Sequence, residues 1–544
     1  MKGVILIVLD VYGIAPPGPG NAIYLANPTN INSFVSSYPN TTLRASGQSV
    51  GLPAEEVGNT EVGHINLGAG RIVFQDLPRI NMSIADGSFY KNPSFLKIKS
   101  HLDETNGKLH IIGLVGEGSV HSSIEHLYAL LFFAKEIGLQ KVYVHAITDG
   151  RDSPPKSAKE IIQQLEEKLS QTKTGIIASI MGRYYGMDRD RRWERTEKAY
   201  IALTKGEGLS ATSAQDAITN AYNEGKTDEF IEPTLITYEN KPISLISEGD
   251  AVVFFNYRID RPRQLTKAFV LEHFEEDANK SFSFDPYAVK YHKTHFPTEI
   301  IVYPPFKRGP KLENLLFITM TEYEKNLPVE VAYPPVTVQF PLGKVLSDKG
   351  INQLRVAESE KERFVTFYFN GQRETPFPIE QRLIVPSPKV PTYDLKPEMA
   401  ANEITDQLLI NMRSMKYPFI LVNFANADMV GHTGNIEATI VAIKTIDQCI
   451  TRIVHQALPL DYSIIITADH GNAEQKINPQ TGEISTEHTS NPVPFIVISN
   501  KFQGRSTKLP SGMLAYVAPT VLTLLDIPKP QTMSGRNLLE ELKF

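Results

Sequence analysis

Three aspartates stand just after short apolar runs, where carboxylates can gather around a metal ion. Asp10 follows residues 4–9, Asp428 follows the run 419–424, and Asp469 follows the run 463–467. Near-continuous apolar runs of this kind are typical of parallel strands that are covered on both faces. Ligands of open α/β sheets bind outside the carboxyl ends of the strands. We therefore expect the three carboxylates to converge although they are far apart in sequence.

Three histidines accompany these aspartates. His432 follows Asp428 by four residues, His470 follows Asp469 directly, and His488 lies in a polar loop. If a helical turn begins at Asp428, its side chain and that of His432 share one face. Imidazole and carboxylate together suit zinc, manganese and similar ions. A single aspartate after a strand is more commonly a turn or capping residue, so it is the coincidence of all six residues that favours a metal site.

A nucleophilic hydroxyl is available in Gly58-Asn59-Thr60-Glu61-Val62-Gly63-His64. The glycines would permit close approach to a bound phosphate, and a coordinated ion would acidify the Thr60 hydroxyl. The alternative interpretation is a turn at Gly58-Asn59 followed by a helix that Thr60 caps. The glycine spacing matches neither a Walker phosphate loop nor a dinucleotide fingerprint.

The middle of the chain carries a different set, which is rich in arginine. Its members are His121, Arg151, Asp152, Arg183, Arg189, Arg258 and Arg261. Guanidinium groups form paired hydrogen bonds with phosphate and carboxylate, so a substrate that carries both groups would use several of them. His121 could carry a proton or donate to phosphate. The alternative is a solvated charged face.

Helical periodicity lies between the apolar runs and predicts an α/β protein. Ser157 is expected to begin a helix with Glu160 completing a capping box. Isoleucines 436, 440, 443 and 450 repeat at helical spacing. Because the two ends of the chain carry acidic and histidine motifs and the middle carries arginines, we expect a middle domain inserted into an outer one.

Several of these segments resemble motifs of the cofactor-independent phosphoglycerate mutases, a family of the alkaline phosphatase superfamily. They are residues 58–64, Asp149-Gly150-Arg151-Asp152, residues 423–432 and Ala468-Asp469-His470-Gly471-Asn472. The resemblance runs from Asp10 to about Pro494 in the family's order. It implies an alkaline-phosphatase-like, metal-binding domain at 1–75 and 309–544, with an inserted α/β transferase domain at 76–308 that binds the substrate.

The resemblance also implies two divalent ions, Mn²⁺ or otherwise Mg²⁺, Co²⁺ or Zn²⁺, and no need for 2,3-bisphosphoglycerate. Asp428, His432 and His488 would hold one ion, and Asp10, Thr60, Asp469 and His470 the other. His121, Arg151, Asp152, Arg183, Arg189, Arg258, Arg261 and Lys361 would hold the substrate. Lys361 enters through the resemblance alone, because by itself it would pass for a surface lysine.

The implied reaction interconverts 3-phosphoglycerate and 2-phosphoglycerate in glycolysis and gluconeogenesis. Thr60 would take the phosphoryl group, the bound glycerate would reorient, and its 2-hydroxyl would take the group back. Asp152 would be the general base for that hydroxyl, and Lys361 would stabilise the transferring group. Thr60, Asp152 and Lys361 are therefore the expected catalytic residues of an isomerase.

Some residues depart from the family pattern. Thr60 stands where serine is usual, and its extra methyl restricts the side-chain rotamer. Val11 replaces a common glycine, residues 116–119 read Gly-Glu-Gly-Ser, and Ser123 stands where a histidine is frequent. Residues 275–308 form a longer insertion than the family leads us to expect.

The composition limits the kinds of partner that the protein is expected to bind. The chain has 544 residues, a net charge of −6, one cysteine and no apolar stretch of membrane-spanning length. We expect a cytoplasmic monomer that acts on a small molecule and binds neither nucleic acid nor a membrane. Two rival functions remain: another phosphatase or phosphomutase of the superfamily, or a catalytically impaired homologue that only binds phosphoglycerate. The arginine set argues against the first, and the complete metal-ligand set argues against the second.

Overall fold

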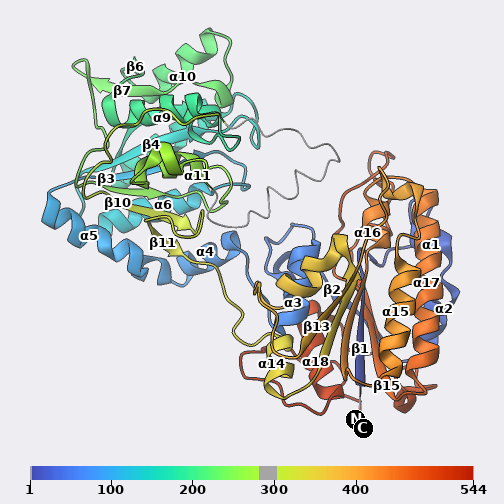
Figure 1. Ribbon diagram of the computed structural model, residues 1–544. Coiled ribbons are helices and arrows are strands. Elements are labelled where there is room, and N and C mark those ends of the chain that lie inside the picture. The colour runs from blue at the N-terminus through green and yellow to red at the C-terminus, as the bar shows by residue number, and fades with distance from the viewer. Residues whose placement is uncertain (1–2, 281–302, 543–544) are drawn as a thin grey trace. The chain divides into compact units, whose positions relative to one another are not determined.

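The computed structural model describes residues 3–280 and 303–542. The chain forms two compact units, which are shown in Figure 1. The outer unit comprises Met1–Gln75 and Val336–Phe544, and the inserted unit comprises Asp76–Pro335. Each unit has helices and one large sheet of its own, so the predicted α/β class is confirmed.

The sheet of the outer unit is parallel across its centre. Its strand order is β13-β12-β14-β1-β15-β16-β2-β17. The bounds are β1 Gly3–Leu9, β2 Asn40–Arg44, β12 Gln353–Glu358, β13 Glu380–Val385, β14 Phe419–Phe424, β15 Tyr462–Thr467, β16 Val493–Ile498 and β17 Gly512–Met513. Strands β13 to β15 in this order are parallel, and β16 is antiparallel to both of its neighbours. The three apolar runs singled out in the sequence are β14, β1 and β15, which lie side by side.

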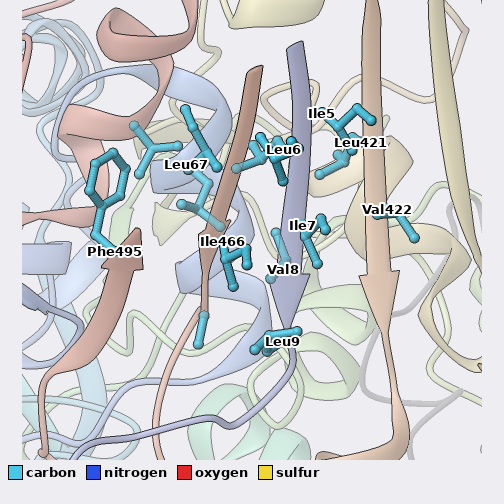
Figure 2. Packing of buried hydrophobic residues seen from close by; sticks show 14 of the residues in the cluster. Ile5, Leu6, Ile7, Val8, Leu9, Leu67, Leu421, Val422, Ile466 and Phe495 are labelled. Atoms are coloured by element: carbon cyan, nitrogen blue, oxygen red, sulfur yellow. The ribbon is translucent and has the colours of Figure 1, made fainter. Parts of the chain in front are cut away.

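Helices cover this sheet, which explains why β1 is apolar throughout. They are α1 Ala22–Ala26, α2 Thr29–Ser37, α3 Thr60–Ala69, α14 Leu342–Asp348, α15 Ala401–Arg413, α16 Asn426–Gly431, α17 Ile436–Ala457 and α18 Val517–Leu524. Every residue of β1 is buried. Figure 2 shows β1 side chains packed among those of the neighbouring strands, such as Leu421 and Ile466. This packing fixes the ends of the central strands, where the functional side chains begin.

The inserted unit has a sheet in the order β11-β10-β9-β3-β4-β5-β7-β6, with β8 paired to β7. The bounds are β3 Leu109–Val115, β4 Val142–Thr148, β5 Ile176–Gly182, β6 Leu209–Ala211, β7 Thr234–Tyr238, β8 Lys241–Pro242, β9 Ala251–Phe254, β10 Leu316–Thr321 and β11 Glu330–Tyr333. From β11 to β5 all neighbours are parallel, and β7 is antiparallel to β5.

The second division of the chain lies at Pro335/Val336 rather than at the expected 308/309. The reason is that β10 pairs with β9 and β11 pairs with β10, so residues 316–333 complete the sheet of the inserted unit. Residues 281–302, which make up most of the unusual 275–308 stretch, lie outside the described residues.

The helices of the inserted unit are α4 Asp76–Ala85, α5 Pro93–Thr105, α6 Ile124–Glu136, α7 Ala158–Thr172, α8 Arg183–Gly186, α9 Trp193–Lys205, α10 Ala214–Asn223, α11 Arg263–Val270 and α12 Phe274–Asp277. The predicted helix after Ser157 is present, but the prediction of a capping box is wrong. Ser157 makes no side-chain cap. The Asp228 carboxylate instead accepts from the N–H groups of Ser157 and Ala158, at 2.8 and 2.9 Å. A distant carboxylate thus occupies the helix N-terminus, which favours negative charge.

His126, on α6, makes the inserted unit sensitive to acid. Burial lowers the pKa of His126 to about 4 from an ordinary 6.5. The unfolded chain therefore binds a proton below pH 6.5 that the folded chain does not, so stability is lost as the pH falls through this range. At pH 5 the loss from this one group is about 2 kcal/mol.

The test compares urea unfolding at pH 7.5 and pH 5 in the wild type and in His126→Gln. Nε2 of His126 lies 2.9 Å from Asn81 Oδ1, and a glutamine amide can replace this hydrogen bond. The variant should lose about 2 kcal/mol less than the wild type on acidification. Equal losses would contradict the assignment.

Among residues 3–280 and 303–542, no helix combines the length and the apolar character that a membrane crossing requires.

Candidate active site

The central strands of the outer unit bring the predicted acidic residues to one edge of the sheet. β1 is flanked by β14 and β15 in parallel register, with Leu9 opposite Phe424 and Val8 opposite Thr467. Asp10 follows β1, Asp428 lies in α16 after β14, and Asp469 follows β15. All three carboxylates are buried. The expected convergence at the carboxyl ends of these strands is therefore present.

Thr60 is the first residue of α3, and its hydroxyl is not used as a helix cap. Asn59 is the N-cap, with its side chain accepting from Val62 N at 2.9 Å. The Thr60 hydroxyl lies 2.9 Å from Nε2 of His470 and 3.3 Å from Oδ1 of Asp10. The capping interpretation of Thr60 is therefore wrong, and its oxygen is available at the centre of the acidic cluster.

The side-chain ammonium group of Lys361 lies within this cluster. Its Nζ lies 2.9 Å from Asp10 Oδ1, 2.5 Å from Asp428 Oδ2 and 3.4 Å from Thr60 Oγ1. The residue is buried in a short 3₁₀ turn after β12. Burial opposes the charge, but Asp10 and Asp428 outweigh it and raise the pKa of Lys361 above its ordinary value. The lysine is thus a fixed positive charge beside the hydroxyl.

His432 and His488 lie next to Asp428 in the same cluster. Nε2 of His432 lies 3.0 Å from Asp428 Oδ1 and 3.2 Å from Nε2 of His488. Nδ1 of His488 lies 2.9 Å from the Gly58 carbonyl, so a proton on Nδ1 leaves Nε2 free as a ligand atom. Burial, together with the charge of His470, lowers the pKa of His488 to about 3. A neutral imidazole of this kind is the form that binds metals.

Within the described residues, two groups of side chains have ligand atoms close enough to share an ion. They are Asp428, His470 and His488, and Asp10, Asp469 and His470. His470 belongs to both, whereas the resemblance places it with the second ion only. His432 lies outside these two groups but adjoins Asp428 and His488.

The charges of the cluster fit divalent cations. Three buried carboxylates surround the single ammonium of Lys361, and burial, with the charge of Asp469, raises the pKa of Asp10 to about 6. Asp428 Oδ1 and Asp469 Oδ2 are buried and accept no hydrogen bond, although histidine nitrogens lie 3.0 and 3.3 Å away. Buried carboxylate oxygens in such a state are suited to coordinate a cation.

Asn423 and His64 also contact the cluster, and neither was assigned from the sequence. Asn423, the fifth residue of β14, donates to Asp10 Oδ2 at 2.8 Å. His64 lies 3.3 Å from Asp469 Oδ2 through Nδ1, which is also 2.9 Å from the Thr60 carbonyl. Asn423 lies in the motif 423–432 and His64 in the motif 58–64, so their positions in these motifs could have identified them as site residues. They orient two carboxylates and the start of α3.

Val11 and Gly63 show how closely the chain packs around the cluster. Val11 has a φ of 59°, a left-handed conformation that a β-branched residue rarely adopts. Its N–H donates to Asp469 Oδ1 at 3.2 Å. A Cβ on Gly63 would lie 2.6 Å from the Cβ of Asp469. Gly63 therefore makes room for Asp469.

In the inserted unit, Arg183 organises the loop that follows β4. Its Nη1 donates to Asp149 Oδ1 and to Asp152 Oδ2, both at 2.5 Å. Ser153 donates to Asp149 Oδ2 at 2.9 Å. Partial burial raises the pKa of Asp152, but the hydrogen bond and charge of Arg183 outweigh it, and that pKa lies below its ordinary value. Asp152 is therefore ionised at neutral pH.

Asp260 likewise orients two arginines, of which Arg189 comes after β5 and Arg258 comes after β9. Arg189 Nη1 donates to Asp260 Oδ2 at 2.6 Å, and Arg258 Nε donates to Asp260 Oδ1 at 3.1 Å. His121, after β3, lies 3.7 Å from both Asp152 and Asp260. Burial lowers the pKa of His121 to about 3, with nearby arginines adding to the effect. Asp149 and Asp260 are the organising residues that sequence reasoning did not assign.

The last two predicted arginines differ in exposure. Arg261 donates to the Met187 carbonyl at 3.2 Å, and burial, together with neighbouring arginines, lowers its pKa to about 10. Arg151 has a largely exposed side chain 3.5 Å from Glu229. The structure thus gathers His121, Asp152, Arg183, Arg189, Arg258 and Arg261 at the carboxyl ends of adjacent strands, which supports a site for an anion.

Comparison with known proteins bears on both units. Residues 80–325 match the family model described as the N-terminus of BPG-independent PGAM. The chain is 48% identical over 538 residues to the 2,3-bisphosphoglycerate-independent phosphoglycerate mutase of Moorella thermoacetica, with 99% of this chain and 98% of that protein covered. The corresponding protein of Clostridium beijerinckii is 47% identical over 539 residues, with 99% of each covered.

A solved structure agrees over nearly the whole length. It is a crystal structure of Leishmania mexicana phosphoglycerate mutase at low cobalt concentration. It matches with a TM-score of 0.59 and 29% identity, over 98% of this chain and 97% of that one. By these similarities, the chain belongs to the 2,3-bisphosphoglycerate-independent phosphoglycerate mutases, a family of isomerases.

Proposed function

We propose that this protein interconverts 3-phosphoglycerate and 2-phosphoglycerate through a phosphoenzyme on Thr60, without 2,3-bisphosphoglycerate, and serves cytoplasmic glycolysis and gluconeogenesis. The observation that carries the proposal is the position of the Thr60 hydroxyl. It lies within 3.4 Å of an imidazole, a carboxylate and an ammonium group in a buried cluster. A nucleophile needs this kind of neighbourhood to lose its proton and to receive a charged group.

Two divalent ions complete the site in this proposal. Asp428, His432 and His488 hold one, and Asp10, Thr60, Asp469 and His470 hold the other. Mn²⁺ suits these mixed oxygen and nitrogen ligands, and Mg²⁺, Co²⁺ or Zn²⁺ are the alternatives. Bound ions of this kind acidify a hydroxyl and neutralise the charge of a phosphoryl group.

The chain's own residues then have distinct tasks. The bond from phosphorus to the 3-oxygen of the substrate breaks as a bond to Thr60 Oγ1 forms. The Thr60 hydroxyl loses its proton in this step, and the 3-oxygen takes up a proton to leave as the hydroxyl of glycerate. Lys361, 3.4 Å from that oxygen, offsets the negative charge of the group in transfer. In the return step the 2-hydroxyl of glycerate attacks the phosphothreonine, its proton passes to Asp152, and the Thr60 oxygen leaves.

The arginines of the inserted unit suit the rest of the substrate. Phosphoglycerate carries one carboxylate and one phosphate, and guanidinium groups bind both through paired hydrogen bonds. Arg189 and Arg258 are held by Asp260, so their side chains are oriented before a ligand arrives. Such orientation reduces the entropy that binding costs.

The test is an enolase-coupled assay of purified protein with 3-phosphoglycerate and no 2,3-bisphosphoglycerate. Turnover should require Mn²⁺ and should fall to the background rate after treatment with a chelator. Re-addition of Mn²⁺ should restore it. Turnover that persists after chelation would contradict the metal assignment. A folded, metal-loaded protein without turnover would favour the impaired homologue that only binds phosphoglycerate.

A further inference from the structure

A second layer of buried polar residues lies behind the proposed metal site. Asn472, Glu474 and Lys476, which we name the 472–476 hub, follow His470 in the chain. Their side chains are almost completely buried, with exposures of 0%, 2% and 0%. Buried polar groups are costly unless they are hydrogen-bonded, so the partners of the hub show what it does.

Glu474 ties the loop after Asp10 to the loop after His488. Its Oε2 accepts from the N–H groups of Gly13 at 3.1 Å and Asn472 at 2.9 Å. Its Oε1 accepts from the Thr489 hydroxyl and from Asn491 Nδ2. A Cβ on Gly13 would lie 2.2 Å from the Glu474 carboxyl carbon, so this approach requires glycine.

Lys476 and Asn472 hold the two segments that carry the proposed histidine ligands His432 and His488. Lys476 Nζ donates to the Gly431 carbonyl at 2.6 Å and to Asn472 Oδ1 at 2.8 Å. Asn472 Nδ2 donates to the carbonyls of Thr486 at 3.0 Å and Glu487 at 2.7 Å. Gly431 directly precedes His432, and Glu487 directly precedes His488. One lysine thus links both histidine segments through one asparagine.

We propose that the 472–476 hub positions the ligands of the metal site, and that Lys476 selectively sets His432 and His488 for the ion they share with Asp428. This inference rests on the proposed function for the identity of the ligands. Lys476 Nζ donates to a backbone carbonyl and to Asn472 rather than to a proposed ligand side chain, so it is a positioning residue rather than a catalytic one. The residues proposed for the other ion are Asp10, Thr60, Asp469 and His470, whereas the two hydrogen bonds of Lys476 Nζ go to Gly431 and Asn472.

The test substitution is Lys476→Met, which keeps the length and apolar stem of the side chain and removes the donor. The Gly431 carbonyl and Asn472 Oδ1 then lose a buried partner. Partners of this kind usually change metal affinity about 10- to 100-fold. We expect one of two Mn²⁺ ions to bind weaker by such a factor in calorimetric titration, while the other keeps its wild-type affinity.

The matched control is Lys267→Met in the inserted unit. Lys267 is also buried, and its Nζ donates to the carbonyls of Ala278 at 3.4 Å and Lys280 at 2.7 Å. Neither Ala278 nor Lys280 adjoins a proposed ion ligand in the sequence, so the loss of these hydrogen bonds should not affect the metal site. The control should keep both Mn²⁺ affinities at wild-type values even if its melting temperature falls. With Lys476→Met, kcat should fall at limiting Mn²⁺ and recover in excess Mn²⁺, with the KM for 3-phosphoglycerate unchanged.

The possible results separate this inference from the proposed function. Two wild-type affinities in Lys476→Met, or an equal loss in both that tracks the melting temperature, would overturn the positioning role. Wild-type protein that binds fewer than two Mn²⁺ ions would overturn it together with the metal assignment. Wild-type protein that binds two ions without turnover would contradict the proposed reaction alone, because the titration result would still decide the role of Lys476.

Discussion

Thr60→Ala is expected to lower mutase turnover by about 10⁵-fold, the order of loss that follows removal of a catalytic nucleophile. The substitution removes the hydroxyl oxygen that lies within 3.4 Å of His470, Asp10 and Lys361 and that accepts the phosphoryl group in our proposal. The measurement is the enolase-coupled rate with 3-phosphoglycerate and Mn²⁺. Thr60 is buried at the start of α3, so a melting curve must accompany the assay.

Thr60→Ser is the matched control, since it keeps the hydroxyl and removes only the methyl group. We expect it to retain turnover within about tenfold of the wild type. A Thr60→Ala protein that folds, binds substrate and keeps more than a hundredth of the wild-type rate would contradict the nucleophile assignment. Equal loss in both variants would show that the methyl contact, rather than the hydroxyl, is what activity needs.

Lys361→Met is expected to lower kcat roughly 10²- to 10³-fold, because the ammonium offsets charge on the group in transfer. Binding of Mn²⁺ should be unchanged or tighter. The reason is that Lys361 Nζ lies 2.9 Å from Asp10 Oδ1 and 2.5 Å from Asp428 Oδ2, so it competes with cations for both carboxylates. The measurements are steady-state kinetics and a calorimetric Mn²⁺ titration of the same preparation.

The two readouts of Lys361→Met discriminate between roles. Loss of turnover with retained Mn²⁺ binding supports a direct part in phosphoryl transfer. Loss of both would mean that the lysine mainly holds the carboxylates in place, and would contradict our account of its role. Lys476→Met serves as the contrasting variant, because it should change Mn²⁺ binding and leave Lys361 untouched.

The convergence of the three carboxylates could be predicted from the sequence because they follow strands that are buried on both faces. β1, β14 and β15 must lie in the interior of a parallel sheet, so Asp10, Asp428 and Asp469 necessarily lie at one edge. Lys361 could not be predicted in this way. It stands in a polar 3₁₀ turn, and only the folded chain shows that the turn is buried beside Asp10.

Other failures share a physical cause, which is that the deciding partner is distant in sequence. Ser157 and Glu160 have the spacing of a capping box, but Asp228 occupies the helix N-terminus instead. The boundary at 308/309 was wrong because β10 and β11 add to the edge of a sheet whose other strands lie before the 275–308 stretch. Local patterns cannot report a partner 71 residues away.

The central claim, that Thr60 carries the phosphoryl group during turnover, is tested most directly by trapping that state. The Mn²⁺-loaded protein would be mixed with ³²P-labelled 3-phosphoglycerate, quenched in acid within the turnover time, digested and mapped by mass spectrometry. The account predicts label on the peptide that contains Thr60, as phosphothreonine, and none in Thr60→Ala. Label on any other residue, or turnover with no labelled protein, would contradict it.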